Sequence, residues 1–304
     1  MKKIYCMSFK WMQMPEIKRE LQVVGQEAGI KAVTRRFGLC KNRYGECAWN
    51  ILKNYDNYGF PPVEKLETFL QEGKEVYGCG LKIGHHATEK GSEETPFLGV
   101  LEYWKNVSAD DYRVKDADIE VYMENVSLSA IPYDVPLTDS HGKEICKVRL
   151  WDAKLKEEYD LDKVLQEGWE KIKQIEFPSQ ITGDLLIPQL NMAGKTQCLR
   201  QKYFMVSANV QWAVKKHMEE ENNIHNFIEK NEFLLCDEWS GLAALELVRI
   251  LQKEYGFSKK DAWEAAEQVC VYEPKEPSKN FLELWPEEII SRVLPEIYQI
   301  LIGK

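Results

Sequence analysis

The chain has 304 residues, of which 44% are hydrophobic and 29% charged, a balance typical of an ordinary globular protein with a sizeable core. Its formal net charge of −9 argues against nucleic acid or an anionic membrane as the default partner. No run approaches the ~20 apolar residues of a bilayer-spanning helix. The 8 cysteines include no C-x-x-C pair, so we expect free thiols in a cytoplasmic protein.

Hydrophobic periodicity predicts strands that alternate with helices. Strands, rich in β-branched and aromatic residues, are expected at 3–9, 76–83, 119–123, 126–131, 233–236 and 269–272. Helices are expected at 17–36, 45–58, 64–70, 161–175, 196–220, 241–255, 259–269 and 285–301. This alternation predicts an α/β fold with a partly parallel sheet flanked by helices. No linker divides the chain, so we expect a single domain over residues 1–304.

Some residues also predict where helices begin and end. Ser258 is expected to cap the helix at 259–269 with Asp261 as its partner, and Gly256 to stop the helix before it. Pro286 is expected at the first position of the last helix. Asp237 is a candidate N-cap for the helix at 241–255.

The most informative motif lies between Ser127 and Asp160. It reads IPYDVPL and, further on, KVRLWDAK. These segments resemble the A-M-P-Y-D-x-P-V-x-G and N-x-M-R-L-W-x-A-K motifs of the α-glucan (glycogen or starch) phosphorylases. The resemblance continues in chain order through KIYCMSFK, GLCKNRYG, QKYFMVSANVQ, LAALELVRIL, CVYEP and LELWP.

The resemblance implies the N-terminal, Rossmann-like domain of a phosphorylase-like fold of the GT-B type. It covers most of the N-terminal half of that family. The family's C-terminal half, which holds its pyridoxal-phosphate lysine, has no counterpart in these 304 residues. We therefore expect no cofactor on this chain.

The chain departs from the family at the positions that carry its chemistry. Cys40, Asn42, Arg43 and Tyr44 occupy much of the segment where the family has a glycine-rich phosphate loop, and their side chains should block close approach of a phosphate. Lys41 and Arg43 could still attract an anion, but as point charges and not as a backbone cradle. Asp237 survives from the family's N-D-T-H-P motif, but Trp239 stands at its histidine. Lys275 replaces the histidine of T-N-H-T. A tryptophan lacks the acceptor nitrogen of histidine, so we expect no catalytic residue here.

Two function hypotheses follow. The first is a catalytically degenerate phosphorylase-like protein, a pseudoenzyme that binds an α-glucan or a protein partner, with Trp11 and Trp239 as candidates for stacking on sugar rings. The second is the N-terminal portion of a split glycogen phosphorylase that acts with a separate chain carrying pyridoxal phosphate. Loss of the glycine loop and of both histidines favours the first, because a working split enzyme should retain them.

The sequence offers two further candidate surfaces. The adjacent His85 and His86 would point to opposite faces of a strand, so we expect no metal site there. The resemblance implies a subunit contact in the helix that begins at Leu161. We therefore expect a homo-oligomer, most simply a dimer, formed through an apolar stripe: Leu161, Val164, Leu165, Trp169 and Ile172. The alternative is that this stripe packs on its own domain.

Overall fold

The computed structural model describes residues 1–7, 68–81, 113–115, 119–138, 144–156, 169–182, 191–235, 241–272 and 285–303. Within them, one mixed sheet has the strand order β3-β4-β5-β2-β1-β6-β7. Its strands are β1 (Lys3–Met7), β2 (Glu75–Leu81), β3 (Ile119–Met123), β4 (Val126–Thr138), β5 (Glu144–Leu155), β6 (Asn231–Leu235) and β7 (Cys270–Tyr272). Strands β5, β2, β1, β6 and β7 pair with one another in parallel. Strand β4 pairs antiparallel with both β5 and β3. The predicted α/β fold with a partly parallel sheet is confirmed.

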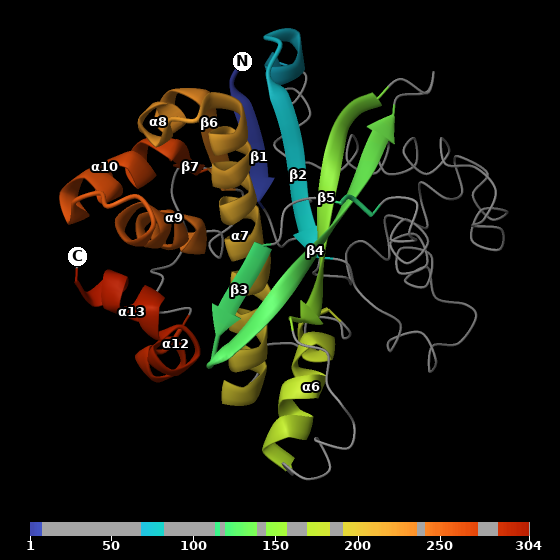
Figure 1. Ribbon diagram of the computed structural model, residues 1–304, viewed down its shortest axis with the longest axis vertical. Coiled ribbons are helices and arrows are strands. Elements are labelled where there is room, and N and C mark those ends of the chain that lie inside the picture. Colours follow the sequence, from blue (N-terminus) through green and yellow to red (C-terminus); the bar gives the residue numbers. More distant parts are fainter. Residues whose placement is uncertain are drawn as a thin grey trace, which may run out of the picture.

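The described helices flank this sheet. They are α6 (Trp169–Thr182), α7 (Met192–Glu221), α8 (Phe227–Lys230), α9 (Leu242–Lys253), α10 (Lys259–Val269), α12 (Glu287–Val293) and α13 (Pro295–Ile302), with a 3-10 turn, η5 (Ile224–Asn226). Helix α7 runs along the sheet, and α6 lies near the end of β5 (Figure 1). In the same view, α9, α10, α12 and α13 lie to the left of α7, on the side away from α6. The helices expected at 17–36 and 45–58 lie outside the described residues.

An aromatic cluster joins the sheet to α7. Tyr5 lies opposite Tyr77 on one side and Phe233 on the other, so the three side chains share a face of the sheet. The Tyr5 ring stacks on Tyr77 with centroids 5.4 Å apart, and Trp212 of α7 meets Tyr5 edge-on at 5.3 Å. Arg149 lies 3.9 Å above the Trp212 ring and forms a two-pronged ion pair with Asp134. The Arg149 of the RLW motif is therefore a core residue.

Helix α7 is longer and more buried than the sequence indicates. It begins at Met192, a turn before the predicted start, because the side chain of Asn191 accepts a hydrogen bond from the Gly194 backbone at 2.8 Å. The predicted apolar face is buried, but so are polar residues on other faces, among them Gln201 and Asn209. The reason is that α7 packs against the sheet as well as against α9 and α12.

Two other helices differ from their predicted limits. Helix α6 continues through Pro178 to Thr182, beyond the predicted end at 175. The single helix predicted at 285–301 is two helices, broken between Leu294 and Pro295. A proline disfavours helical dihedrals in the residue before it, and Leu294 has φ −131° and ψ 64°. Pro286, expected inside the first turn, is the N-cap of α12. The predicted roles of Ser258 and Gly256 (φ +71°) are confirmed.

A two-residue turn between β3 and β4 yields a first prediction. Glu124 and Asn125 both have positive φ, 49° and 62°. A β-branched residue is strained there, so we expect Asn125→Val to lower the free energy of unfolding by about 1–2 kcal/mol. Asn125→Gly is the matched control, since it loses the same Tyr122 hydrogen bond without the strain. Equal urea midpoints for the two variants would contradict this assignment.

Candidate functional site

Three neighbouring strands end at one edge of the sheet. Strand β1 ends at Met7, β6 at Leu235 and β7 at Tyr272. Met7 pairs with Leu235, and Leu235 pairs with Tyr272, so their carboxyl ends lie side by side. Ligands of open parallel α/β sheets bind in the crevice beyond the carboxyl ends of the strands. This edge is therefore the expected location of a ligand-binding site.

The sequence-predicted ligand residues follow these strand ends. In the sequence Trp11 comes after β1, Asp237 and Trp239 come between β6 and α9, and Lys275 comes after β7. These four residues, and also Lys41 and Arg43, lie outside the described residues. The described strands show where the chain leaves the sheet before each of Trp11, Asp237, Trp239 and Lys275. That these residues form one group remains a prediction.

The start of α9 corrects one expectation. Its N-cap is Gly241, which has helical dihedrals (φ −54°, ψ −21°), and no side chain accepts a capping hydrogen bond. Asp237 is therefore not the N-cap of this helix. Since a helix can begin without a side-chain cap where packing holds it, contacts further along α9 must stabilise it.

A buried carboxylate anchors α9 on α7. Glu246 is fully buried and accepts hydrogen bonds from Tyr203 Oη at 2.9 Å and from Ser207 Oγ at 2.8 Å. Arg249 donates to both of its oxygens at 2.9 Å. Burial, followed by the charge of Glu246, raises the pKa of Tyr203 well above its ordinary value, so the phenol stays a donor. All donors around Glu246 are engaged, which indicates a structural role.

This network is not among the features predicted from the sequence, although a signal for it is present. Glu246 and Arg249 are one turn apart in the LELVRIL segment, and Tyr203 and Ser207 are one turn apart in YFMVS. Polar residues at helical spacing on otherwise apolar segments indicate a satisfied buried pair. Nothing in the sequence states that these two segments face each other.

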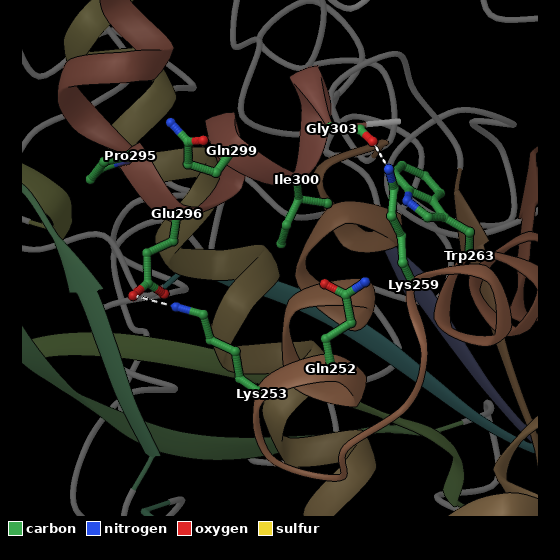
Figure 2. A pocket seen from close by; sticks show the side chains of 9 residues that line it. All are labelled: Gln252, Lys253, Lys259, Trp263, Pro295, Glu296, Gln299, Ile300 and Gly303. Atoms are coloured by element: carbon green, nitrogen blue, oxygen red, sulfur yellow. Dashed lines mark hydrogen bonds and ion pairs between the residues drawn. The ribbon is translucent and has the colours of Figure 1, made fainter.

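A surface hollow lies between α9, α10 and α13 (Figure 2). This α9–α13 hollow has a volume of about 430 Å³ and is lined by Gln252, Lys253, Lys259, Trp263, Pro295, Glu296, Gln299, Ile300 and Gly303. An ion pair of 2.6 Å joins Lys253 to Glu296, and Lys259 Nζ donates to the Gly303 carbonyl. The side-chain amides of Gln252 and Gln299 make no hydrogen bond in the described structure. Its wall is mostly apolar with two available amides, which suits a neutral polar ligand.

Metal and thiol chemistry find little support among the described residues. No group of three or more His, Cys, Asp or Glu side chains is placed to hold a metal ion there, and His85 and His86 lie outside that part of the chain. Cys6, Cys79, Cys198 and Cys270, the cysteines of the described residues for which pairing can be judged, form no disulfide there. Burial raises the pKa of Cys270 to about 12, so its thiol is a poor nucleophile at neutral pH.

The described residues do not fit pyridoxal phosphate, the cofactor that the resemblance implies for the family. The cofactor needs an accessible lysine for its imine and a cradle for its phosphate. The two buried lysines of the described part are Lys3 and Lys202. Lys3 pairs with Glu220, and Lys202 Nζ lies 6.0 Å from the centre of the Trp285 ring. The lysines that line the α9–α13 hollow, Lys253 and Lys259, are engaged with Glu296 and with the Gly303 carbonyl.

The stripe predicted for self-association is described only in part. Trp169 is the first residue of α6, and Ile172 on the same helix is half-buried. Leu161, Val164 and Leu165 lie outside the described residues, so the stripe as a surface remains a prediction. Among the described helices, none has the combination of length and apolar character that a membrane span requires.

Comparison with known proteins gives the chain its family. The sequence pattern of the carbohydrate phosphorylases matches residues 97–303. Glycogen phosphorylase of Haemophilus influenzae is 28% identical over 182 residues, which are 60% of this chain and 22% of that protein. Glycogen phosphorylase of Bacillus subtilis is 24% identical and the cytosolic alpha-glucan phosphorylase 2 of Arabidopsis thaliana 25% identical, each over 74% of this chain and 30% of the relative. The chain thus spans less than a third of the length of these relatives. With more than half of its residues inside the family match, this chain belongs to the carbohydrate phosphorylase family.

Proposed function

We propose that the chain is a catalytically degenerate member of its family that binds an α-glucan without cleaving it. The observation that carries this proposal is the position of the altered family motifs relative to the strands of the sheet. Strands β6 and β7 are parallel neighbours, and just beyond their ends Trp239 and Lys275 stand where the family motifs have histidines. The two replacements next to the same edge exchange both imidazole groups, one for an indole and one for an ammonium group, and neither can accept a proton as a neutral imidazole does.

The retained features of the edge favour binding over chemistry. Tryptophan presents a large flat surface that packs against the apolar face of a sugar ring, and Trp11 and Trp239 are the candidates for this contact. Asp237 and Lys275 supply an acceptor and a donor for hydroxyl groups. Lys41 and Arg43 add positive charge, which would attract an anion as point charges without a backbone cradle. The relatives are glycogen and alpha-glucan phosphorylases, and this supplies the class of ligand.

Glycogen binding tests this function. We expect the chain to co-sediment with glycogen, and Trp239→Ala to weaken binding roughly tenfold, the ratio that about 1.4 kcal/mol of lost stacking corresponds to. Gln252→Ala in the α9–α13 hollow is the matched control and should leave binding unchanged. Absence of glycogen binding by the wild-type chain would overturn the proposed function. Loss of glycogen binding in Gln252→Ala, with binding by Trp239→Ala unchanged, would show that the glucan binds in the α9–α13 hollow and not at the sheet edge.

The second candidate is the N-terminal portion of a split phosphorylase. The chain covers 22–30% of the length of these relatives, and in this candidate it supplies the part of the site that lies in the covered segment. A separate pyridoxal-phosphate-carrying chain would then be the partner. Co-purification of such a chain from the native cell, with phosphorolysis in the complex, would support this candidate against the first.

Self-association is part of the proposed function. We expect the chain to sediment as a dimer and Trp169→Glu to sediment as a monomer, because a buried carboxylate in an apolar contact lacks a partner. Ser179→Glu is the control, since Ser179 is an exposed residue of the same helix. A wild-type monomer at all concentrations would show that the stripe packs on its own domain.

A further inference from the structure

A second hollow lies between α7, the first residue of β3 and the end of α9. Its volume is about 470 Å³, within the range of small-molecule sites. Figure 1 shows β3 beside α7, and both α7–β3 and α7–α9 are in contact. None of its lining residues belongs to the α9–α13 hollow or to the sheet edge where the glucan is proposed.

The floor of this hollow is apolar. Val214, Ile250 and Ile119 are all at most 3% exposed, and Met218 is half-buried beside them. A thioether next to branched aliphatic groups makes a surface that adapts to the shape of an apolar ligand. Water over such a floor is readily displaced by an apolar group.

The rim of the hollow is rich in acceptors. Gln211 commits its amide nitrogen to Glu120 O at 2.8 Å and to Ser207 Oγ at 2.9 Å, which leaves its carbonyl oxygen as the available group. Glu219 makes no ion pair with any described residue. Glu254 is 3.6 Å from Arg249, but that guanidinium is held by Glu246 on both oxygens.

The donors of the rim are largely engaged. Lys215, the basic residue of the lining, already interacts within the protein. The remaining polar group is the phenol of Tyr255, which both donates and accepts. Acceptors outnumber available donors on this rim, so the hollow complements a ligand that carries N–H donors and positive charge at one end and an apolar body at the other.

We propose that this hollow binds an organic cation with an apolar body, of the amidinium or guanidinium class. The apolar body lies on Met218, which is half-buried above the buried side chains of Val214 and Ile250. The planar N–H groups donate to Glu254, Glu219 and the Gln211 carbonyl, since a planar fork of donors matches carboxylate geometry. An anionic ligand of the same shape is rejected by the two carboxylates.

Titration calorimetry with benzamidine tests this site. Burial raises the pKa of the Glu254 carboxyl above its ordinary value, so the titration is run at about pH 7.5, well above the ordinary range of a glutamate. We expect saturable binding of benzamidine at one site and none of benzoate or benzyl alcohol. Glu254→Gln and Glu219→Gln should each weaken binding about tenfold, because each removes a charged acceptor.

Glu264→Gln is the control variant, because Glu264 pairs with Lys260 on α10 and lies outside the hollow. It should bind benzamidine as the wild type does, and thermal melts should show that all three variants remain folded. Equal binding of benzamidine and benzyl alcohol would overturn the site, as would unchanged affinity in Glu254→Gln and Glu219→Gln. Absence of benzamidine binding by the wild-type chain would also overturn it, and this outcome is independent of glycogen binding.

Discussion

Replacing Glu246 with Ala is expected to lower the free energy of unfolding by about 3–5 kcal/mol, the usual cost of removing one partner from a buried ion pair. The variant leaves Arg249, whose side chain is 15% exposed, without its main counter-charge. It also leaves the hydroxyls of Tyr203 and Ser207 without their acceptor. Because these groups join α9 to α7, urea unfolding followed by circular dichroism should show the loss.

The control for this prediction removes the pair as a unit. Glu246→Leu combined with Arg249→Met keeps similar volume and leaves no buried charge, so most of the stability should return. The gain over Glu246→Ala measures the penalty of the isolated charge. If Glu246→Ala unfolds at the wild-type urea concentration, the network does not anchor α9.

The fold was predictable where a local pattern is strong. Alternation in IEVYM predicts β3 with its buried and exposed residues in register, and Ser258 with Asp261 predicts the start of α10. The limits that failed depend on contacts far along the chain. Helix α7 is buried on several faces because helices cover it opposite the sheet, which no single-helix pattern reveals. Pro295 itself predicts the break before it, because a proline disfavours helical dihedrals in the preceding residue. The helical spacing of apolar residues continues on both sides of Pro295 and favours a single helix instead.

The site was predictable only to the level of an edge. Parallel pairing of β1, β6 and β7 brings together the strand ends that precede Trp11, Asp237, Trp239 and Lys275. The two surface hollows were not predictable, because each is lined from three elements whose packing angles decide its shape. Their polar residues, such as Gln252 and Glu254, resemble ordinary solvated helix residues in the sequence.

Phosphorolysis of glycogen by this chain is expected to be undetectable. The reaction needs a phosphate held beside the sugar and hydrogen-bond donors placed where charge develops. General acid–base catalysis and electrostatic stabilisation each contribute about 10²–10⁴-fold. Trp239 and Lys275 stand at the histidine positions, and the glycine-loop segment carries the side chains of Cys40, Asn42, Arg43 and Tyr44, so several such contributions are lost together. Supplying pyridoxal phosphate should not restore them, and no aldimine absorbance should develop.

The most direct test of a degenerate glucan-binding protein is release of glucose 1-phosphate from glycogen by the chain, with phosphate and pyridoxal phosphate added. We predict that none is released under conditions where the same sample co-sediments with glycogen. Asp237→Ala is the diagnostic variant, because Asp237 is the retained polar member of the family motif. Clear release of glucose 1-phosphate by the wild-type chain, abolished in Asp237→Ala, would contradict the account and identify a reduced but working active site.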